Sequence, residues 1–80
     1  VLGDEHADTL VYMHNLAATL RAHGELTRAR DLQEQVLTTN QRLLGEGHPE
    51  TRSAMRSLAY TLSLLGDDAG AGDLELRAMR

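Results

Sequence analysis

The 80 residues allow one small domain. With 41% apolar residues and no Phe or Trp, its core must be built from Leu, Met, Val and Ala packed closely, as they are between helices. A net charge of −4 argues against a general nucleic-acid or anionic-membrane surface, both of which need excess positive charge. The absence of Cys excludes disulfides and thiolate metal sites and fits a cytoplasmic location.

The first half of the chain predicts two amphipathic helices, over about residues 7–23 and 26–43. Their apolar residues recur at the 3.6-residue spacing that places them on one face of a helix. Gly24 follows the first of them and is a typical helix stop. The predicted inward residues are Leu10, Met13, Leu16, Ala17 and Leu20 in the first helix, and Leu26, Ala29, Leu32, Val36, Leu37 and Leu43 in the second.

The second half predicts helices over about residues 49–65 and 68–80. Pro49 suits the first turn of a helix, where its missing N–H is not needed. Gly66 ends the third predicted helix as Gly24 ends the first. Gly70 and Gly72 each cost about 1 kcal/mol relative to Ala inside a helix, so we expect the last helix to be frayed until about residue 71. The predicted inward residues are Met55, Leu58, Ala59, Leu62 and Leu65 in the third helix, and Leu74, Ala78 and Met79 in the fourth; Leu76 should point outward.

The two halves are copies of one another. Residues 2–38 aligned with residues 44–80, a shift of 42, give 13 identities in 37 pairs, mainly at apolar, Gly and loop positions. A period of this length is typical of stacked repeats. We therefore predict an all-α fold of two tandem helix-turn-helix repeats, residues 1–43 and 44–80. The chain begins at the loop motif and stops inside a helical pattern, so we expect a piece excised from a longer protein. All eight basic residues are Arg, which suggests a GC-rich bacterial genome.

The repeat resembles a known family. The pattern Asn15-Leu16-Ala17-x-x-Leu20-x-x-x-Gly24-x-Leu26-x-x-Ala29-x-x-Leu32 is similar to the tetratricopeptide repeat. The long second helix and the loop with Leu44, Gly45, His48, Pro49 and Thr51 resemble the kinesin-light-chain variant. The resemblance implies a short α-solenoid that serves as a protein–protein interaction scaffold within a larger bacterial regulatory protein.

In that family the first helix of each repeat lines a concave groove that receives a peptide or another protein's helix. Arg21 and Arg56, with Arg52 as a candidate third, could form a positive floor that binds a carboxylate; ordinary solvated helix charges are the alternative. By position, the groove residues implied are Val11, His14, Ala18, Arg21, Ser53, Arg56, Tyr60 and Ser63.

The alternative function is self-assembly. Repeat arrays usually need at least three repeats for stability, so two repeats leave two open ends for a neighbour or a second subunit to cover. Candidate contacts are Leu74, Leu76 and Met79 of the fourth helix, or the outer face of the first. A dimer or another homo-oligomer, a truncated array and a stable monomer all stay open.

No residues stand in a pattern that predicts catalysis, a cofactor or a metal site. His6 and His48 occupy the same repeat position and are best explained as loop residues that satisfy backbone groups near a helix start. Ser53, Ser57 and Ser63 lie on a helix without the sharp turn that exposes a nucleophile. The sequence therefore predicts a protein that is not an enzyme and has no cofactor.

Overall fold

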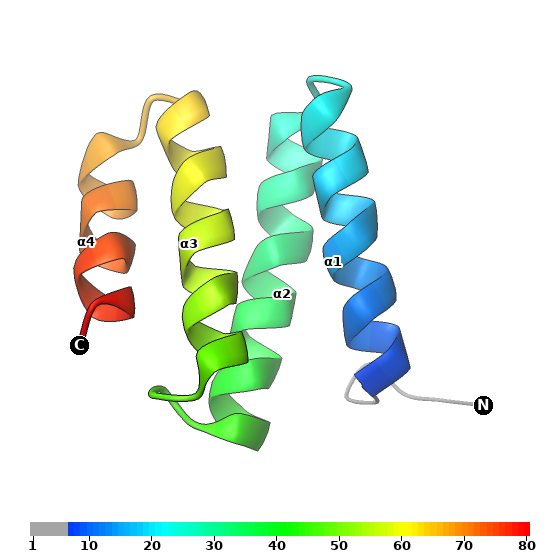
Figure 1. Cartoon of the computed structure of the whole chain (residues 1–80). Helices are drawn as coiled ribbons and strands as arrows, with labels where there is room; N and C mark the ends of the chain where they lie inside the picture. The colour runs from blue at the N-terminus through cyan, green and yellow to red at the C-terminus, as the bar shows by residue number, and fades with distance from the viewer. Residues whose placement is uncertain (1–6) are drawn as a thin grey trace.

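A computed structural model of the chain describes residues 7–80, with side chains from Thr9 onward, as four helices in a row (Figure 1). They are α1 (Ala7–Ala22), α2 (Leu26–Leu44), α3 (Pro49–Leu64) and α4 (Asp68–Ala78). Packing joins α1 to α2, α2 to α3 and α3 to α4, and the Cα atoms span only 13 Å in the thinnest direction. The prediction of an all-α pair of tandem repeats is confirmed, and each helix ends within two residues of its predicted limit.

Glycine ends the first helix of each repeat in the same way. Gly24 and Gly66 have φ angles of 81° and 90°, a left-handed conformation that costs glycine little. The chain then folds back, so that the N–H of the next residue donates across the turn to a carbonyl five residues earlier. These bonds run from Glu25 to Leu20 (2.9 Å) and from Asp67 to Leu62 (2.8 Å). The predicted stops are confirmed as tight turns that make each pair of helices antiparallel.

The loop between the repeats is built around His48. Its Nδ1 accepts a hydrogen bond of 3.1 Å from the backbone N–H of Glu50, which caps the start of α3. Pro49 occupies the first turn as predicted. The loop role predicted for His48 is therefore confirmed, whereas the matching His6 lies outside the described residues.

The start of α4 differs from the prediction. The helix is regular from Asp68 onward, across Gly70 and Gly72, and is not frayed there. The carboxylate of Asp67 accepts a hydrogen bond of 2.9 Å from the backbone N–H of Gly70. This N-cap satisfies one of the free N–H groups at the helix start and offsets the low helix propensity of the glycines.

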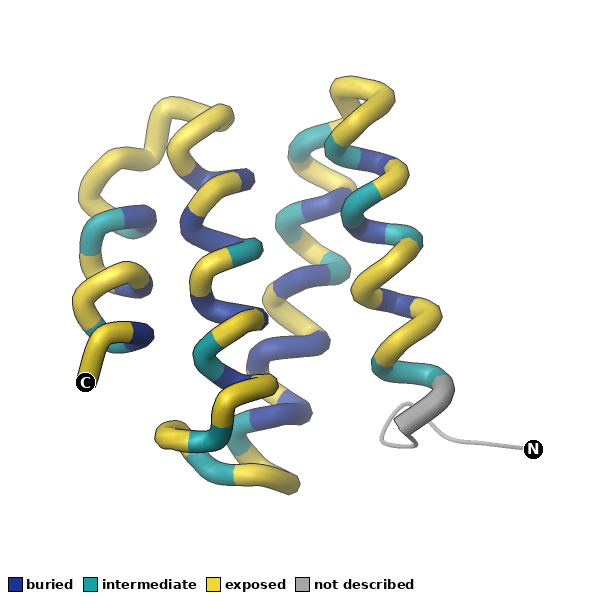
Figure 2. The backbone as a smooth tube through the Cα atoms, in the orientation of Figure 1, coloured by how far each residue is buried: buried dark blue, intermediate teal, exposed yellow. Residues whose placement is uncertain are grey.

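The main hydrophobic cluster lies between α2, α3 and α4 and includes Met13 of α1. Ala17 and Leu20 of α1 and Ala29 of α2 are buried as well, outside this cluster (Figure 2). Its buried members are Met13, Val36, Leu37, Ala54, Met55, Leu58, Ala59, Leu62, Ala71, Leu74 and Ala78. Most of the predicted inward residues are therefore buried or half-buried. The core is continuous across the repeat boundary, because Val36 and Leu37 of the first repeat belong to the same cluster as residues of the second.

Three residues predicted to point inward are exposed instead. Leu43, Leu65 and Met79 have exposed fractions of 46%, 37% and 80%. Each lies in the last turn of a helix or just beyond it, where the described part of the chain places no further helix over it. An apolar stripe predicts which face turns inward, but burial also requires a neighbour at that height along the helix.

Candidate binding groove between the first and third helices

The eight residues predicted to line a groove lie on matching faces of α1 and α3. In each helix they are spaced by three, four and three residues, so they form one stripe. Ala18 and Arg21 are half-buried, and the other six are exposed. Val11 and Tyr60, each 56% exposed, present the largest apolar surfaces of the set.

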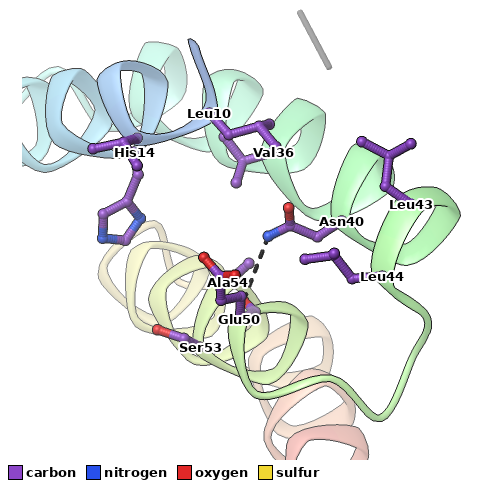
Figure 3. Close-up of a pocket in the computed structure, with 10 residues that line it drawn as sticks. Leu10, His14, Val36, Asn40, Leu43, Leu44, Glu50, Ser53 and Ala54 are labelled. Carbon is purple, nitrogen blue, oxygen red and sulfur yellow. Dashed lines mark hydrogen bonds between the residues drawn. The ribbon is translucent and has the colours of Figure 1, made fainter. Parts of the chain in front are cut away.

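A pocket of about 280 Å³ opens at one end of this groove (Figure 3). Residues from α1, α2 and α3 line it: Leu10, Val11, His14, Val36, Asn40, Leu43, Leu44, Glu50, Ser53 and Ala54. Val11, His14 and Ser53 are three of the eight groove residues implied by the resemblance. The structure thus brings residues 42 positions apart in the sequence to one cavity.

The floor of the pocket is fixed in place by buried groups. Val36 and Ala54 are 4% and 5% exposed and belong to the core. Asn40, 6% exposed, donates from Nδ2 to the backbone carbonyl of Glu50 at 3.4 Å, the dashed line in Figure 3. This hydrogen bond joins the end of α2 to the start of α3, so the two helices that carry the floor are held in register.

At the opposite end of the groove, a cation–π contact joins the two helices. The guanidinium carbon of Arg21 on α1 lies 4.8 Å from the centre of the Tyr60 ring on α3. Stacking of this kind uses the flat face of the guanidinium and leaves its in-plane N–H groups able to donate. Arg21 therefore bridges the two groove helices and is itself half-buried.

Arg52 does not belong to the positive floor suggested for the groove. Its Nη2 donates to the backbone carbonyl of Arg80 at the end of α4. The side chain therefore points to the α4 side of α3, away from α1. Arg52 does not line the pocket, although its counterpart in the first repeat, Leu10, does. Arg56 is exposed on the groove face one turn before Tyr60.

The three residues predicted for self-association differ in burial. Leu74 is 6% exposed and belongs to the core, so it cannot contact a second subunit in this conformation. Leu76 and Met79 are 62% and 80% exposed on α4.

Sequence reasoning missed the contribution of α2 to the pocket. Leu43 was expected in the core and Leu44 in the loop, but α2 continues to Leu44 and carries both to the pocket wall. The adjacent pair of leucines before Gly45 was the available signal. Its place could not be deduced, because it depends on how far α2 extends past the start of α3.

The described residues contain no group of three or more His, Asp or Glu side chains that could hold a metal ion. Among the four helices none is both long and apolar enough to cross a membrane. The groove offers a ligand a mostly apolar pocket, the guanidinium groups of Arg21 and Arg56, and several hydrogen-bonding side chains.

Comparison with known proteins supports this reading of the architecture. The sequence model described as tetratricopeptide repeat matches residues 9–50, which is more than half of the chain and as long as the internal shift of 42 residues. No curated protein sequence matches the chain. The finer likeness to the kinesin-light-chain variant stays a prediction. The chain belongs to the tetratricopeptide repeat family, a non-catalytic helical repeat fold generally used for protein–protein interaction.

Proposed function

We propose that this chain binds a peptide or a helix of another protein in the groove between α1 and α3, as one module of a larger regulatory protein. The observation that carries the proposal is the pocket of about 280 Å³ at the groove's end. Its wall combines exposed apolar side chains from α1 and α2 with a polar edge from α3. The apolar part suits an anchoring side chain of a peptide, and the polar edge suits the peptide's backbone.

The size and lining of the pocket favour an apolar anchor. Val11, Leu43 and Leu44 are 56%, 46% and 39% exposed, and all three line the cavity. Its volume lies at the lower limit of pockets that hold a whole small molecule, about 300 Å³. A Leu, Met or Phe side chain of a partner would cover these residues, and burial of apolar area is the main source of binding free energy.

The charges along the groove favour an acidic residue beyond the anchor. Arg56 lies about 4.5 Å along α3 from Ser53 at the pocket, and Tyr60, over which Arg21 stacks, lies about 10.5 Å along. An extended peptide covers that distance in about three residues and a helical one in about seven. We expect a carboxylate at one of these spacings to meet the two guanidinium groups.

Selection of peptides from a random display library on the immobilised 80-residue chain tests this proposal. We expect enrichment of sequences with a large apolar residue followed by Asp or Glu. A labelled selected peptide should then lose most of its affinity for Val11→Glu, which places a charge on the pocket wall. Arg21→Ala with Arg56→Ala should weaken binding about tenfold or more, since hydrogen bonds to charged groups contribute about 1.5–3 kcal/mol.

Gln35→Ala is the matched control, because Gln35 is exposed on α2 and lines a different hollow, away from the groove. It should leave peptide affinity unchanged. Equal affinity for wild type and Val11→Glu, or selected sequences with no shared apolar anchor, would contradict the proposal. The expectations of a bacterial origin, a cytoplasmic location and no cofactor stay predictions.

A further inference from the structure

The pocket at the end of the groove carries one carboxylate with no cation beside it. Glu50 is exposed in the first turn of α3, and it is the only Asp or Glu among the described residues that lines the pocket. Its N–H donates to Nδ1 of His48, and its carbonyl accepts from Nδ2 of Asn40. Within the described part of the chain its side-chain carboxylate forms no hydrogen bond and no ion pair. The backbone of Glu50 is therefore held in place while its charge stays unmatched.

The neighbouring charged groups have partners elsewhere. Glu46, in the loop four residues earlier, accepts a hydrogen bond of 2.7 Å from Arg77 of α4. Arg52, in the same turn as Glu50, donates to a backbone carbonyl at the end of α4 and points to that side of α3. Arg56 lies about 9 Å along the helix axis from Glu50. The negative charge of Glu50 is thus left for a ligand to meet.

The groove therefore has unlike charges at its two ends. Glu50 lies about 4.5 Å along α3 to one side of Ser53, and Arg56 lies about 4.5 Å to the other side. Arg21 adds a second guanidinium beyond Arg56, over the ring of Tyr60. A peptide laid along α3 would pass one negative charge at the pocket and then two positive charges.

We propose that the pocket binds the partner's apolar anchor together with an adjacent Lys or Arg, whose cation pairs with Glu50. This inference rests on the proposed peptide binding and names the class of partner, a segment in which a basic, a large apolar and an acidic residue follow in this order. Such a segment complements the groove at all three points, whereas an acidic residue beside the anchor would meet the like charge of Glu50. Complementarity of this kind fixes the register of a bound chain and excludes wrong partners.

The surroundings of Glu50 suit a long basic side chain. Leu43 and Leu44 are 46% and 39% exposed and line the same pocket (Figure 3). The methylene stem of a Lys or Arg can cover such apolar surface while its charged end stays at the rim. An anchor in the pocket would also remove water from around Glu50, and an unpaired charge without water is costly. A cation on the partner removes this cost.

The spacing of charges along α3 sets their spacing in the partner. Glu50 and Arg56 are six residues apart, about 9 Å along the helix axis. An extended peptide spans this distance in about three residues and a helical one in about six. We therefore expect the basic and the acidic residue about three positions apart in an extended partner, with the anchor between them.

Parallel selections from one random peptide display library test the proposal, on the wild-type chain, Glu50→Arg and Glu34→Arg. We expect wild type to enrich Lys or Arg on one side of the apolar anchor and Asp or Glu on the other. Glu50→Arg should keep the anchor but enrich Asp or Glu in place of the basic residue. Glu34→Arg is the matched control with the same change of charge, because Glu34 is exposed and lines the same separate hollow as Gln35. It should select the same sequences as wild type.

A labelled peptide from the wild-type selection then measures the contact itself. Replacing its basic residue by Ala should weaken binding to wild type about fivefold, the upper range for a partly exposed ion pair. The same replacement should leave binding to Glu50→Gln unchanged, because that variant has no charge at this position. Gln keeps the length of the side chain, and both hydrogen bonds of residue 50 use its backbone, so circular dichroism should show unchanged helix content.

Three results would overturn the proposal, and they differ in what else they affect. Equal flanking charges around the anchor in the wild-type and Glu50→Arg selections would mean that Glu50 does not read the partner, although the groove proposal would stand. An equal loss of affinity for wild type and Glu50→Gln, when the peptide's basic residue is removed, would assign its cation to another group. The absence of a shared anchor from every selection would contradict the groove proposal and this inference together.

Discussion

The first helices of the two repeats have related sequences but different surroundings. α3 lies between α2 and α4, whereas the described residues place α1 against α2 with its other side uncovered. Met55 of α3 is fully buried, and its counterpart Met13 of α1 is 8% exposed. In a stacked repeat, the contribution of equivalent residues to stability therefore depends on how many neighbouring helices pack against the helix that carries them.

The largest effect should come from truncating the more enclosed methionine. Met55→Ala should lower the free energy of unfolding by about 3 kcal/mol, since it removes a large side chain from a fully packed site. Met13→Ala should cost clearly less, because α1 can shift on its uncovered side to fill the space. Urea denaturation followed by circular dichroism measures both. Equal losses would show that the two methionines contribute equally to stability, whatever the number of helices packed around each.

The second helices of the repeats differ at their first turn. Asp67 caps α4 through the hydrogen bond to Gly70, whereas its counterpart Glu25 makes no side-chain cap to the start of α2 among the described residues. Glu25 instead forms an exposed ion pair with Arg28, 2.6 Å between Oε1 and Nη1. The helix with the lower helix propensity, α4 with its two glycines, therefore has the side-chain cap that α2 lacks.

Asp67→Ala should therefore destabilise the chain by about 1 kcal/mol, the usual effect of losing an N-cap. Glu25→Ala is the matched control and should change stability by only a few tenths of a kcal/mol, since it removes a surface ion pair. Thermal unfolding of the two variants under the same conditions measures the difference. A larger loss for Glu25→Ala would mean that the cap does not hold α4 together.

The two glycines of α4 should respond in opposite directions to alanine. A Cβ at Gly70 would lie 2.6 Å from Oδ2 of Asp67, so Gly70→Ala should disturb the cap and destabilise the helix. A Cβ at Gly72 would meet nothing within 4 Å, so Gly72→Ala should stabilise the chain by about 0.5–1 kcal/mol through its higher helix propensity. Denaturation midpoints measure both changes. Stabilisation by both substitutions would show that Gly70 is not needed for the cap.

The smallest effect concerns the contact between the inter-repeat loop and α4. Hydrogen bonds from Arg77 (2.7 Å) and then from Gln41 (3.1 Å) hold the pKa of Glu46 below its ordinary value of 4.5. A lowered folded-state pKa stabilises the chain above the unfolded value, and this stabilisation is lost as pH falls through the folded-state pKa.

Glu46→Gln should therefore have a lower free energy of unfolding than wild type near neutral pH, with the gap closing as the pH falls below 4.5 and through the lowered folded-state pKa. Since Glu46 is exposed, the gap should also shrink in high salt. Unfolding curves across this pH range measure it. A gap that persists at low pH would assign the effect to packing instead of charge.

The helices and the repeat were predictable because they depend on local and periodic features. Apolar spacing, Gly24 and Gly66 and the internal copy predicted four helices and their limits to within two residues. Three of the eight residues predicted for the groove line one pocket, because equivalent positions of two repeats face the same way. Their role in binding stays a prediction.

The remaining features depend on the neighbours of each residue. The sequence by itself determined the period, the helical turns and the inward stripe, because these are properties of short segments. Only the tertiary structure decided that Leu43 and Leu44 reach the pocket wall, that Arg52 bonds to the end of α4, and that Tyr12 and Met79 are left open. The physical reason is that burial is a property of two surfaces in contact, and the sequence of one helix specifies only its own surface.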